Sequence, residues 1–243
     1  MTGSPVSVLL GSGGISTQDR RDTFRNLVSS HFSGCKQVLF VPYASQDHDK
    51  YTIRMQEFLG SDAPIMSGIH TFEDTSQALA EADGIYVGGG NSFLLIRDLH
   101  ELGLVTPIRD MVLRGAPYLG VSAGANVACP TMMTTNDMPI TLPTSFSSLG
   151  LVPFQINPHY HPGKILFMDG NELRDHYGES RAQRIAEFHR IHQDPVLGMW
   201  EGSFVHWDGS IGQLSGRATA FRVGENPVEL ADGSTFEARL ELV

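Results

Sequence analysis

Cysteine is scarce in this chain of 243 residues, with only Cys35 and Cys129 present and no C-x-x-C pair. A disulfide scaffold and a cysteine zinc site are therefore excluded, and both cysteines are expected as reduced thiols. Long apolar runs are also missing. The first apolar stretch, Val6–Leu10, is interrupted by Ser7, follows no positively charged segment and ends at Gly11. It is neither a signal peptide nor a membrane span, and a cytoplasmic protein is expected.

Basic residues are few: 17 Lys and Arg stand against 27 Asp and Glu, which gives a formal net charge of −10. A field of that sign repels a nucleic-acid backbone, so no nucleic-acid partner is expected. Nucleotide-binding fingerprints are incomplete as well. The glycine-rich turn Gly11–Ser16 has serine where the third glycine of G-x-G-x-x-G belongs, and no G-K-[ST] occurs. We therefore expect a small-molecule partner and no cofactor.

Short apolar runs alternate with longer amphipathic segments, the pattern of strands that feed helices in a largely parallel sheet. In chain order the predicted elements are Val6–Leu10, Thr17–Phe32, Val38–Val41, Ile53–Leu59, Gly84–Val87, Ser92–Leu102 and Tyr118–Val121. Near the C-terminus, turn dipeptides predict two β-hairpins, Phe204–Trp207 with Ile211–Leu214 and Val228–Leu230 with Thr235–Leu242. The expectation is a single α/β domain over residues 1–243, with a mostly parallel sheet flanked by helices and C-terminal hairpins.

The segment Tyr118–Asn126 combines a strand, the motif G-x-S-x-G and a helix of small residues. A sharp strand-to-helix turn of this kind exposes the hydroxyl of Ser122 as a nucleophile, and the amide of Ala123 becomes an oxyanion donor. Gly90, in the glycine loop Gly88–Asn91 after another strand, is the candidate for the second donor. The structural alternatives are a serine N-cap on a buried helix and a glycine turn that only caps the next helix.

A serine nucleophile needs a base and an orienting acid. His159 follows the predicted strand Leu151–Ile156, which places the imidazole on the same rim as the serine turn. Its neighbour His161 leaves open a metal pair, although no third ligand has a recognisable spacing. Glu201 ends the predicted strand Pro195–Trp200 and is the candidate acid. The other carboxylates that the sequence leaves open are Asp169, Glu172 and Asp194.

Five segments together resemble the dipeptidase E, or α-aspartyl dipeptidase, family. They are Gly120–Asn126, Thr134–Ile140, Gln155–His159, Gly178–Arg184 and Glu201-Gly202. The resemblance runs from the glycine loop at Gly88 to Gly202, in the right order, and is far more specific than the serine motif alone.

The resemblance implies a serine peptidase on a fold like that of class I glutamine amidotransferases. It implies Ser122 as nucleophile, His159 as base and Glu201 as acid, with the amides of Gly90 and Ala123 as the oxyanion hole. It also implies removal of an N-terminal aspartate from dipeptides, without metal or cofactor.

This chain departs from the family pattern at two places. Val121 stands where the family often has a bulky aromatic residue, which changes the packing behind the serine. The segment His161–Tyr177 is longer than in bacterial members. Because it joins the base to Arg181, it is a candidate lid that alters which side chain is accepted.

Arg181 is the candidate reader of an acidic substrate. Ser180 and Gln183 form a predicted capping box, so Arg181 begins a helix that is expected to run to His192. On that helix Arg181 shares the apolar stripe with Ile185 and Phe188. A guanidinium at a helix N-terminus suits a carboxylate, and the resemblance assigns the matching arginine to the substrate's aspartyl side chain. The alternative is a structural ion pair with Glu179 or Asp175.

The sequence also leaves other functions open. A cyanophycinase-like or β-aspartyl peptidase of the same superfamily would release β-linked products. A non-catalytic acidic-peptide-binding protein would use the Arg181 pocket alone, and an esterase would hydrolyse esters but not dipeptides. The sequence is compatible with a monomer or a small homo-oligomer.

Overall fold

The computed structural model describes residues 6–60 and 63–243. Its elements are β1 (Val8–Gly11), α1 (Gln18–His31), β2 (Gln37–Val41), α2 (His48–Leu59), β3 (Ile65–Gly68), the 3-10 turn η1 (Ile69–Thr71), α3 (Thr75–Glu81), β4 (Gly84–Val87), α4 (Ser92–Glu101), α5 (Val105–Leu113), β5 (Tyr118–Val121), α6 (Ala123–Ala128), β6 (Gln155–Tyr160), β7 (Leu166–Asp169), β8 (Glu172–Asp175), α7 (Arg181–Phe188), β9 (Val196–Trp200), β10 (Phe204–Trp207), β11 (Gly212–Ser215), β12 (Ala218–Phe221), β13 (Val228–Leu230) and β14 (Thr235–Phe236).

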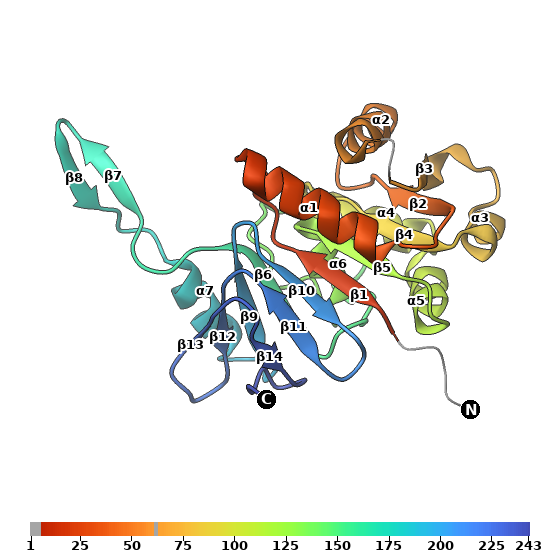
Figure 1. The fold of residues 1–243 in the computed structure, drawn as a ribbon. Helices are drawn as coiled ribbons and strands as arrows, with labels where there is room; N and C mark the ends of the chain where they lie inside the picture. The colour runs from red at the N-terminus through yellow and green to blue at the C-terminus, as the bar shows by residue number, and fades with distance from the viewer. Residues whose placement is uncertain (1–5, 61–62) are drawn as a thin grey trace.

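The main sheet has eight strands in the order β14-β11-β10-β1-β5-β4-β2-β3 (Figure 1). Pairing is parallel from β1 through β3 and antiparallel from β1 to β14. The mostly parallel sheet flanked by helices is therefore confirmed, and the seven predicted elements before residue 122 lie within a few residues of their predicted bounds, except that α2 begins earlier, at His48.

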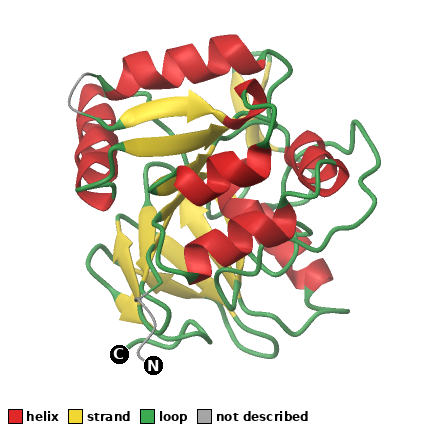
Figure 2. Ribbon diagram, turned by 90° about the vertical axis from the view of Figure 1, so that its right-hand side faces the viewer, coloured by secondary structure: helices red, strands yellow, loops and turns green. Residues whose placement is uncertain are grey.

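Both faces of this sheet are covered by helices, as Figure 2 shows. Successive strand residues point to opposite faces. Leu9 belongs to an apolar cluster with Phe24 of α1 and Met55 of α2, whereas Leu10 belongs to a larger cluster on the other face with Leu95 of α4. That burial on both sides explains why the central strands are nearly continuous apolar runs. Within the described residues, no helix has the length and apolar character needed to cross a membrane.

A second sheet of four strands, in the order β13-β12-β9-β6, packs beside the first. Here the prediction for Leu151–Ile156 was wrong: β6 begins at Gln155 and runs to Tyr160, so His159 lies inside the strand. The pairing of β6 with β9 shifts register between Asn157 and Tyr160, and this irregularity lets a strand residue turn out of the ladder. The candidate base His159 and the candidate acid Glu201, which directly follows β9, are thus held by a different sheet from Ser122.

Of the two C-terminal hairpins, the pair β10 and β11 is confirmed. The second was wrong, because β13 pairs with β12 of the second sheet while β14 pairs with β11 of the first. The turn between them is fixed by another contact: the Asp232 carboxylate accepts a hydrogen bond from the Gly216 amide at 2.7 Å. The chain therefore passes from one sheet to the other at a turn that resembles a hairpin in sequence.

The segment His161–Tyr177 forms an arm built on the antiparallel pair β7 and β8. In Figure 1 the arm points away from the body of the molecule, and every residue of its two strands is exposed. Arg174 bridges Asp169 and Glu172 at the arm's tip. In this conformation the segment is an extended arm and does not cover the serine as a lid.

Candidate active site

Ser122 occupies a strained turn between β5 and α6. Its φ of 55° and ψ of −110° are unfavourable for a residue with a side chain. Flanking glycines permit the turn, because a side chain at Gly120 or Gly124 would collide with backbone atoms of Gly124 or Val87. The hydroxyl of Tyr118 donates to the Gly124 carbonyl at 2.7 Å and fixes the start of the helix. This conformation holds the Ser122 hydroxyl away from α6, and the hydroxyl makes no N-cap hydrogen bond with that helix.

The glycine loop after β4 lies against the serine. A Cβ at Gly89 would be 3.1 Å from the Ser122 Cβ, and Gly90 has a φ of 139° that favours glycine. The Asn91 amide bonds to the Ala44 carbonyl at 2.9 Å and anchors the loop. Among the described residues, the amides of Gly90 and Ala123 have no hydrogen-bond partner, so both donors remain available for an oxyanion near Ser122.

His159 lies between the serine and a carboxylate. Its Nε2 is 2.8 Å from Ser122 Oγ, and its Nδ1 is 2.7 Å from Glu201 Oε1. The imidazole and the carboxylate are both partly exposed, at 37% and 44% of their side chains. This is the order of contacts that a nucleophile, a general base and an orienting acid require. The rival acids Asp169 and Glu172 lie on the arm and pair with Arg174 instead.

Ser12, which the sequence reasoning missed, holds the base in place. This fully buried hydroxyl accepts a hydrogen bond from the His159 amide at 2.8 Å and donates to the Met199 carbonyl at 3.0 Å. Asn136 holds the same strand from the other side, since its Nδ2 donates to the Pro158 carbonyl at 2.7 Å. His159 needs such anchors because its φ is 54°.

The glycine turn after β1, which fails as a nucleotide fingerprint, packs on the base and the acid. A side chain at Gly13 would lie 2.9 Å from His159 Cε1, and one at Gly14 would overlap the Glu201 carboxylate. The Gly202 amide donates to the Gly13 carbonyl at 2.7 Å. The glycines are needed for close approach to side chains rather than to phosphates. The glycines of this turn are visible in the sequence, but the sequence does not indicate which side chains they contact.

Arg181 begins α7, and the capping box of Ser180 and Gln183 is confirmed. The helix ends at Phe188 rather than His192, and the Phe188 and His192 rings stack with their centroids 4.4 Å apart. Within the part of the chain that the structure describes, no carboxylate lies at ion-pair distance from Arg181, and Asp175 pairs with Lys164. Burial lowers the pKa of Arg181, as does Arg184, while the charge of Asp137 raises it.

Asp137, which is half-buried, is hydrogen-bonded to the start of α4. One carboxylate oxygen accepts hydrogen bonds from the Ser92 amide and from the Ser92 hydroxyl, both at 2.7 Å. The Asn136 side chain is already engaged with Pro158 and Asn157. Of Asn136 and Asp137, it is therefore Asp137 that keeps a side-chain oxygen available to a ligand.

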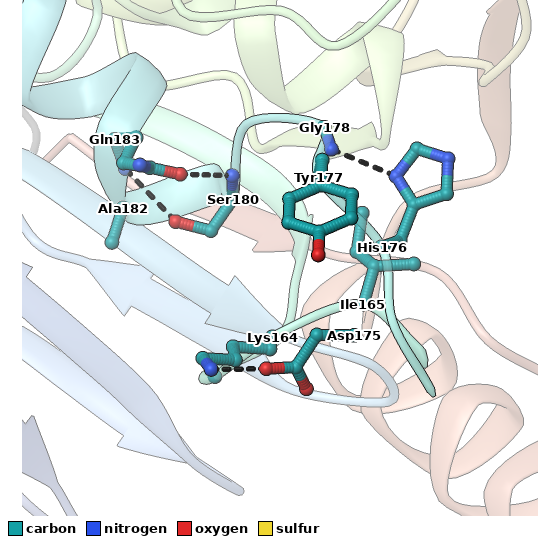
Figure 3. A pocket seen from close by; sticks show the side chains of 10 residues that line it. Lys164, Ile165, Asp175, His176, Tyr177, Gly178, Ser180, Ala182 and Gln183 are labelled. Carbon is teal, nitrogen blue, oxygen red and sulfur yellow. Dashed lines mark hydrogen bonds and ion pairs between the residues drawn. The ribbon is translucent and has the colours of Figure 1, made fainter. Parts of the chain in front are cut away.

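A cavity of about 530 Å³ lies where the arm meets α7 (Figure 3). Its lining includes Tyr177, His176 and the capping residue Ser180, and it adjoins Arg181 without including the serine, the base or the acid. His161 is exposed at the start of the arm. Among the described residues no group of three His, Cys, Asp or Glu side chains could hold a metal ion.

The comparisons with known proteins agree on one group. A model of peptidase family S51 matches residues 7–214. The chain is 48% identical to a probable alpha-aspartyl dipeptidase of Drosophila melanogaster over 83% of this chain and 79% of that protein. It is 44% identical to a peptidase E of Streptomyces coelicolor, over 85% of this chain and 83% of that protein.

Two solved structures share the fold. A peptidase from an acI-B1 Actinobacterium matches with a TM-score of 0.66 at 17% identity, covering 97% of this chain and 98% of that one. A putative peptidase E of Listeria monocytogenes EGD-e matches with a TM-score of 0.58 at 22% identity, covering 94% of this chain and 99% of that one. On the strength of the family match over residues 7–214 and of the relatives at 48% and 44% identity, the chain belongs to peptidase family S51.

Proposed function

We propose that this protein is a serine-type dipeptidase that hydrolyses dipeptides with an N-terminal aspartate. The observation that carries the proposal is the chain of contacts from Ser122 Oγ through the His159 imidazole to Glu201, at 2.8 and 2.7 Å. The relatives named alpha-aspartyl dipeptidase and peptidase E support the substrate class.

In the proposed reaction, Ser122 Oγ attacks the carbonyl carbon of the aspartyl residue while His159 Nε2 takes the hydroxyl proton. Glu201 accepts from His159 Nδ1 and stabilises the imidazolium. The amides of Gly90 and Ala123 donate to the oxyanion. His159 then returns the proton to the leaving nitrogen, and the C–N bond breaks. Water, activated by the same imidazole, hydrolyses the acyl-enzyme and releases aspartate.

Substrate selection rests on two charges of opposite sign. The Arg181 guanidinium has no ion-pair partner among the described residues and binds the aspartyl side-chain carboxylate. Asp137 lies close enough to raise the pKa of Arg181 and binds the free α-amine. In a protein with a net charge of −10, a local cation is what attracts an acidic substrate.

The remaining features of the proposal concern the protein's setting. The two free thiols support a reducing, cytoplasmic location, and the net negative charge argues against nucleic acid as a partner. The largest buried cluster includes residues of both sheets, among them Val8 and Leu197, which supports one domain. We propose a monomer or a small homo-oligomer that needs no cofactor.

The test is to incubate the protein and its Ser122→Ala variant with Asp-Leu, Asn-Leu, Leu-Leu and β-linked Asp-Leu, and to quantify released leucine. We expect release from Asp-Leu alone, and none with the variant. Release from the β-linked isomer instead would assign a cyanophycinase-like or β-aspartyl activity. If no peptide is cleaved and a serine-directed reagent does not label Ser122, the protein is a binding protein.

A further inference from the structure

An apolar cavity of about 400 Å³ lies on the α1 and α2 side of the main sheet. Phe24, Tyr51, Met55, Phe58, Tyr86 and Val121 line its apolar part. Except for Phe58, these side chains are buried at 9% exposure or less. Burial raises the pKa of both tyrosines, so their phenols are uncharged near neutral pH. The cavity therefore suits an uncharged, apolar group.

The cavity adjoins the catalytic residues through glycines. Gly13, Gly14 and Gly89 also line it, and these same residues lie against His159, Glu201 and Ser122 respectively. Because these three residues have no side chain, they do not block the path from the Ser122 hydroxyl to the cavity. A group attached to the scissile nitrogen can reach it directly.

The cavity and the Arg181 site lie on different sides of the nucleophile. The helix α7, which Arg181 begins, lines a pocket together with Thr135 and Asn136. The next residue, Asp137, is bonded to the start of α4, and α4 covers the face of the sheet opposite to α1 and α2. Ser122 directly follows β5, a strand of the sheet that has these two faces. A dipeptide whose acyl half contacts Arg181 therefore places its leaving half toward the apolar cavity.

Among the described residues that line the cavity, Arg54 alone carries a charge. Its guanidinium lies over the Tyr51 ring, 5.0 Å from the centroid. Within residues 6–60 and 63–243, no carboxylate pairs with it and no hydrogen bond engages it. Two other arginines near the cavity are occupied: Arg25 donates to the Phe58 carbonyl at 2.7 Å, and Arg21 donates to the carbonyl of Ile15 at 3.1 Å. Arg54 thus keeps all its donors available for an anion.

We propose that this cavity is the binding site for the leaving amino acid, and that Arg54 binds its free α-carboxylate. The inference rests on the proposed function and adds the second half of the substrate. An apolar residue with a free carboxylate is the ligand that matches an apolar cavity with a single cation. It also gives a physical reason for dipeptide specificity, since a longer peptide has no carboxylate at that position.

The test compares kcat/KM for Asp-Leu, Asp-Leu amide and Asp-Gly. The enzyme is expected to prefer Asp-Leu to its amide by roughly tenfold, since the amide loses a charge-assisted hydrogen bond. Asp-Leu is expected to exceed Asp-Gly by about tenfold or more, because burial of the leucine side chain is lost. Both effects are expected mainly in KM, as they remove binding common to the ground state and the transition state.

Arg54→Met keeps most of the side chain and removes the charge. It is expected to bring the ratio of Asp-Leu to Asp-Leu amide close to one, while Arg114→Ala, an equal loss of charge at the exposed C-cap of α5, keeps the ratio of the unmodified enzyme. Ile15→Trp fills the exposed rim of the cavity and is expected to reduce the preference for Asp-Leu over Asp-Gly. Thermal unfolding of each variant checks that the fold is retained.

The outcomes separate the two proposals. Hydrolysis of Asp-Leu amide as fast as Asp-Leu, or a ratio unchanged in Arg54→Met, overturns the role of Arg54 but leaves aspartyl hydrolysis established. Equal rates for Asp-Leu and Asp-Gly overturn the apolar site. If neither Asp-Leu nor its amide is cleaved, the proposed function fails, and this inference fails with it.

Discussion

Replacing Ser12 by alanine tests whether the first strand positions the catalytic base. The Ser12 hydroxyl is fully buried and connects the His159 amide, at 2.8 Å, to the Met199 carbonyl, at 3.0 Å. Ser12→Ala leaves the His159 N–H without this acceptor in a buried region. A buried donor without a partner costs about 1–3 kcal/mol of folding free energy.

The catalytic cost is expected to be larger than the loss of stability suggests. His159 has a φ of 54°, and without the Ser12 contact this backbone can relax and move the imidazole from Ser122. A displacement of about 1 Å in a reacting group costs on the order of 100-fold in rate. We expect kcat for Asp-Leu to fall between about 10- and 100-fold, with KM little changed, since Ser12 does not touch the substrate.

Ser203→Ala is the matched control. Ser203 is a serine of nearly equal burial, 2% exposed, and its hydroxyl also bridges two backbone groups, the amide and carbonyl of Arg217, at 2.9 and 2.8 Å. Urea unfolding is expected to show a similar loss of stability for both variants, and only Ser12→Ala is expected to lower kcat. Equal kcat values for the two variants would refute a positioning role for Ser12.

Three further predictions follow from the site and the core. Ser122→Ala is expected to lower kcat by about six orders of magnitude and Glu201→Gln by about four, measured by leucine release; a loss under tenfold for either would contradict the triad. Arg181→Lys is expected to fail to restore the preference for Asp-Leu over Asn-Leu that Arg181→Ala loses, because a lysine lacks the bidentate fork. Burial lowers the pKa of His31 to about 4. The neutral form of His31 therefore stabilises the fold above pH 6.5, and that contribution, up to about 3 kcal/mol, is lost as the pH falls toward 4. The free energy of unfolding of His31→Phe is therefore expected to fall less over that range than that of the unmodified protein, and equal pH dependence would contradict the assignment.

Most strands and helices in the first half of the chain could be predicted, because each is indicated by the pattern of its own residues. Strands β1, β2, β4 and β5 are buried apolar runs, and the helices after β1, β2 and β4 each have an apolar stripe at the helical period. The edge strand β3 was missed, because only Met66 and Gly68 of its four residues are buried and Ile65 is exposed. Two helices were nevertheless missed. The helix α5 contains Pro107, which the first turn tolerates because its amide needs no partner there. The seven-residue α3 is set by its cap, since the Asp74 carboxylate accepts from the amides of Ser76 and Gln77.

The second sheet could not be predicted because its pairing is distant in sequence. β6 lies between a long irregular segment and the arm, and its partner β9 is some forty residues further on. Ser122, His159 and Glu201 could be named as candidates because each follows or interrupts a strand at a motif of the family. Their supports could not: Ser12 is 147 residues from His159, and nothing in the glycine turn at Gly13 indicates which side chain it approaches.

The two strained residues of the proposed triad, Ser122 and His159, share one anchor, the end of β1. Ser122 and His159 are two of the three non-glycine residues with positive φ in the described part of the chain, and each such conformation costs about 1–3 kcal/mol. The Ser122 amide donates to the Gly11 carbonyl at 2.9 Å, and the His159 amide donates to the hydroxyl of the next residue, Ser12. Two consecutive residues, Gly11 and Ser12, thus hold the proposed nucleophile from one sheet and the proposed base from the other. Because β1 is the strand on which both depend, a change at its end alters the distance between the reacting atoms even where it leaves each sheet intact.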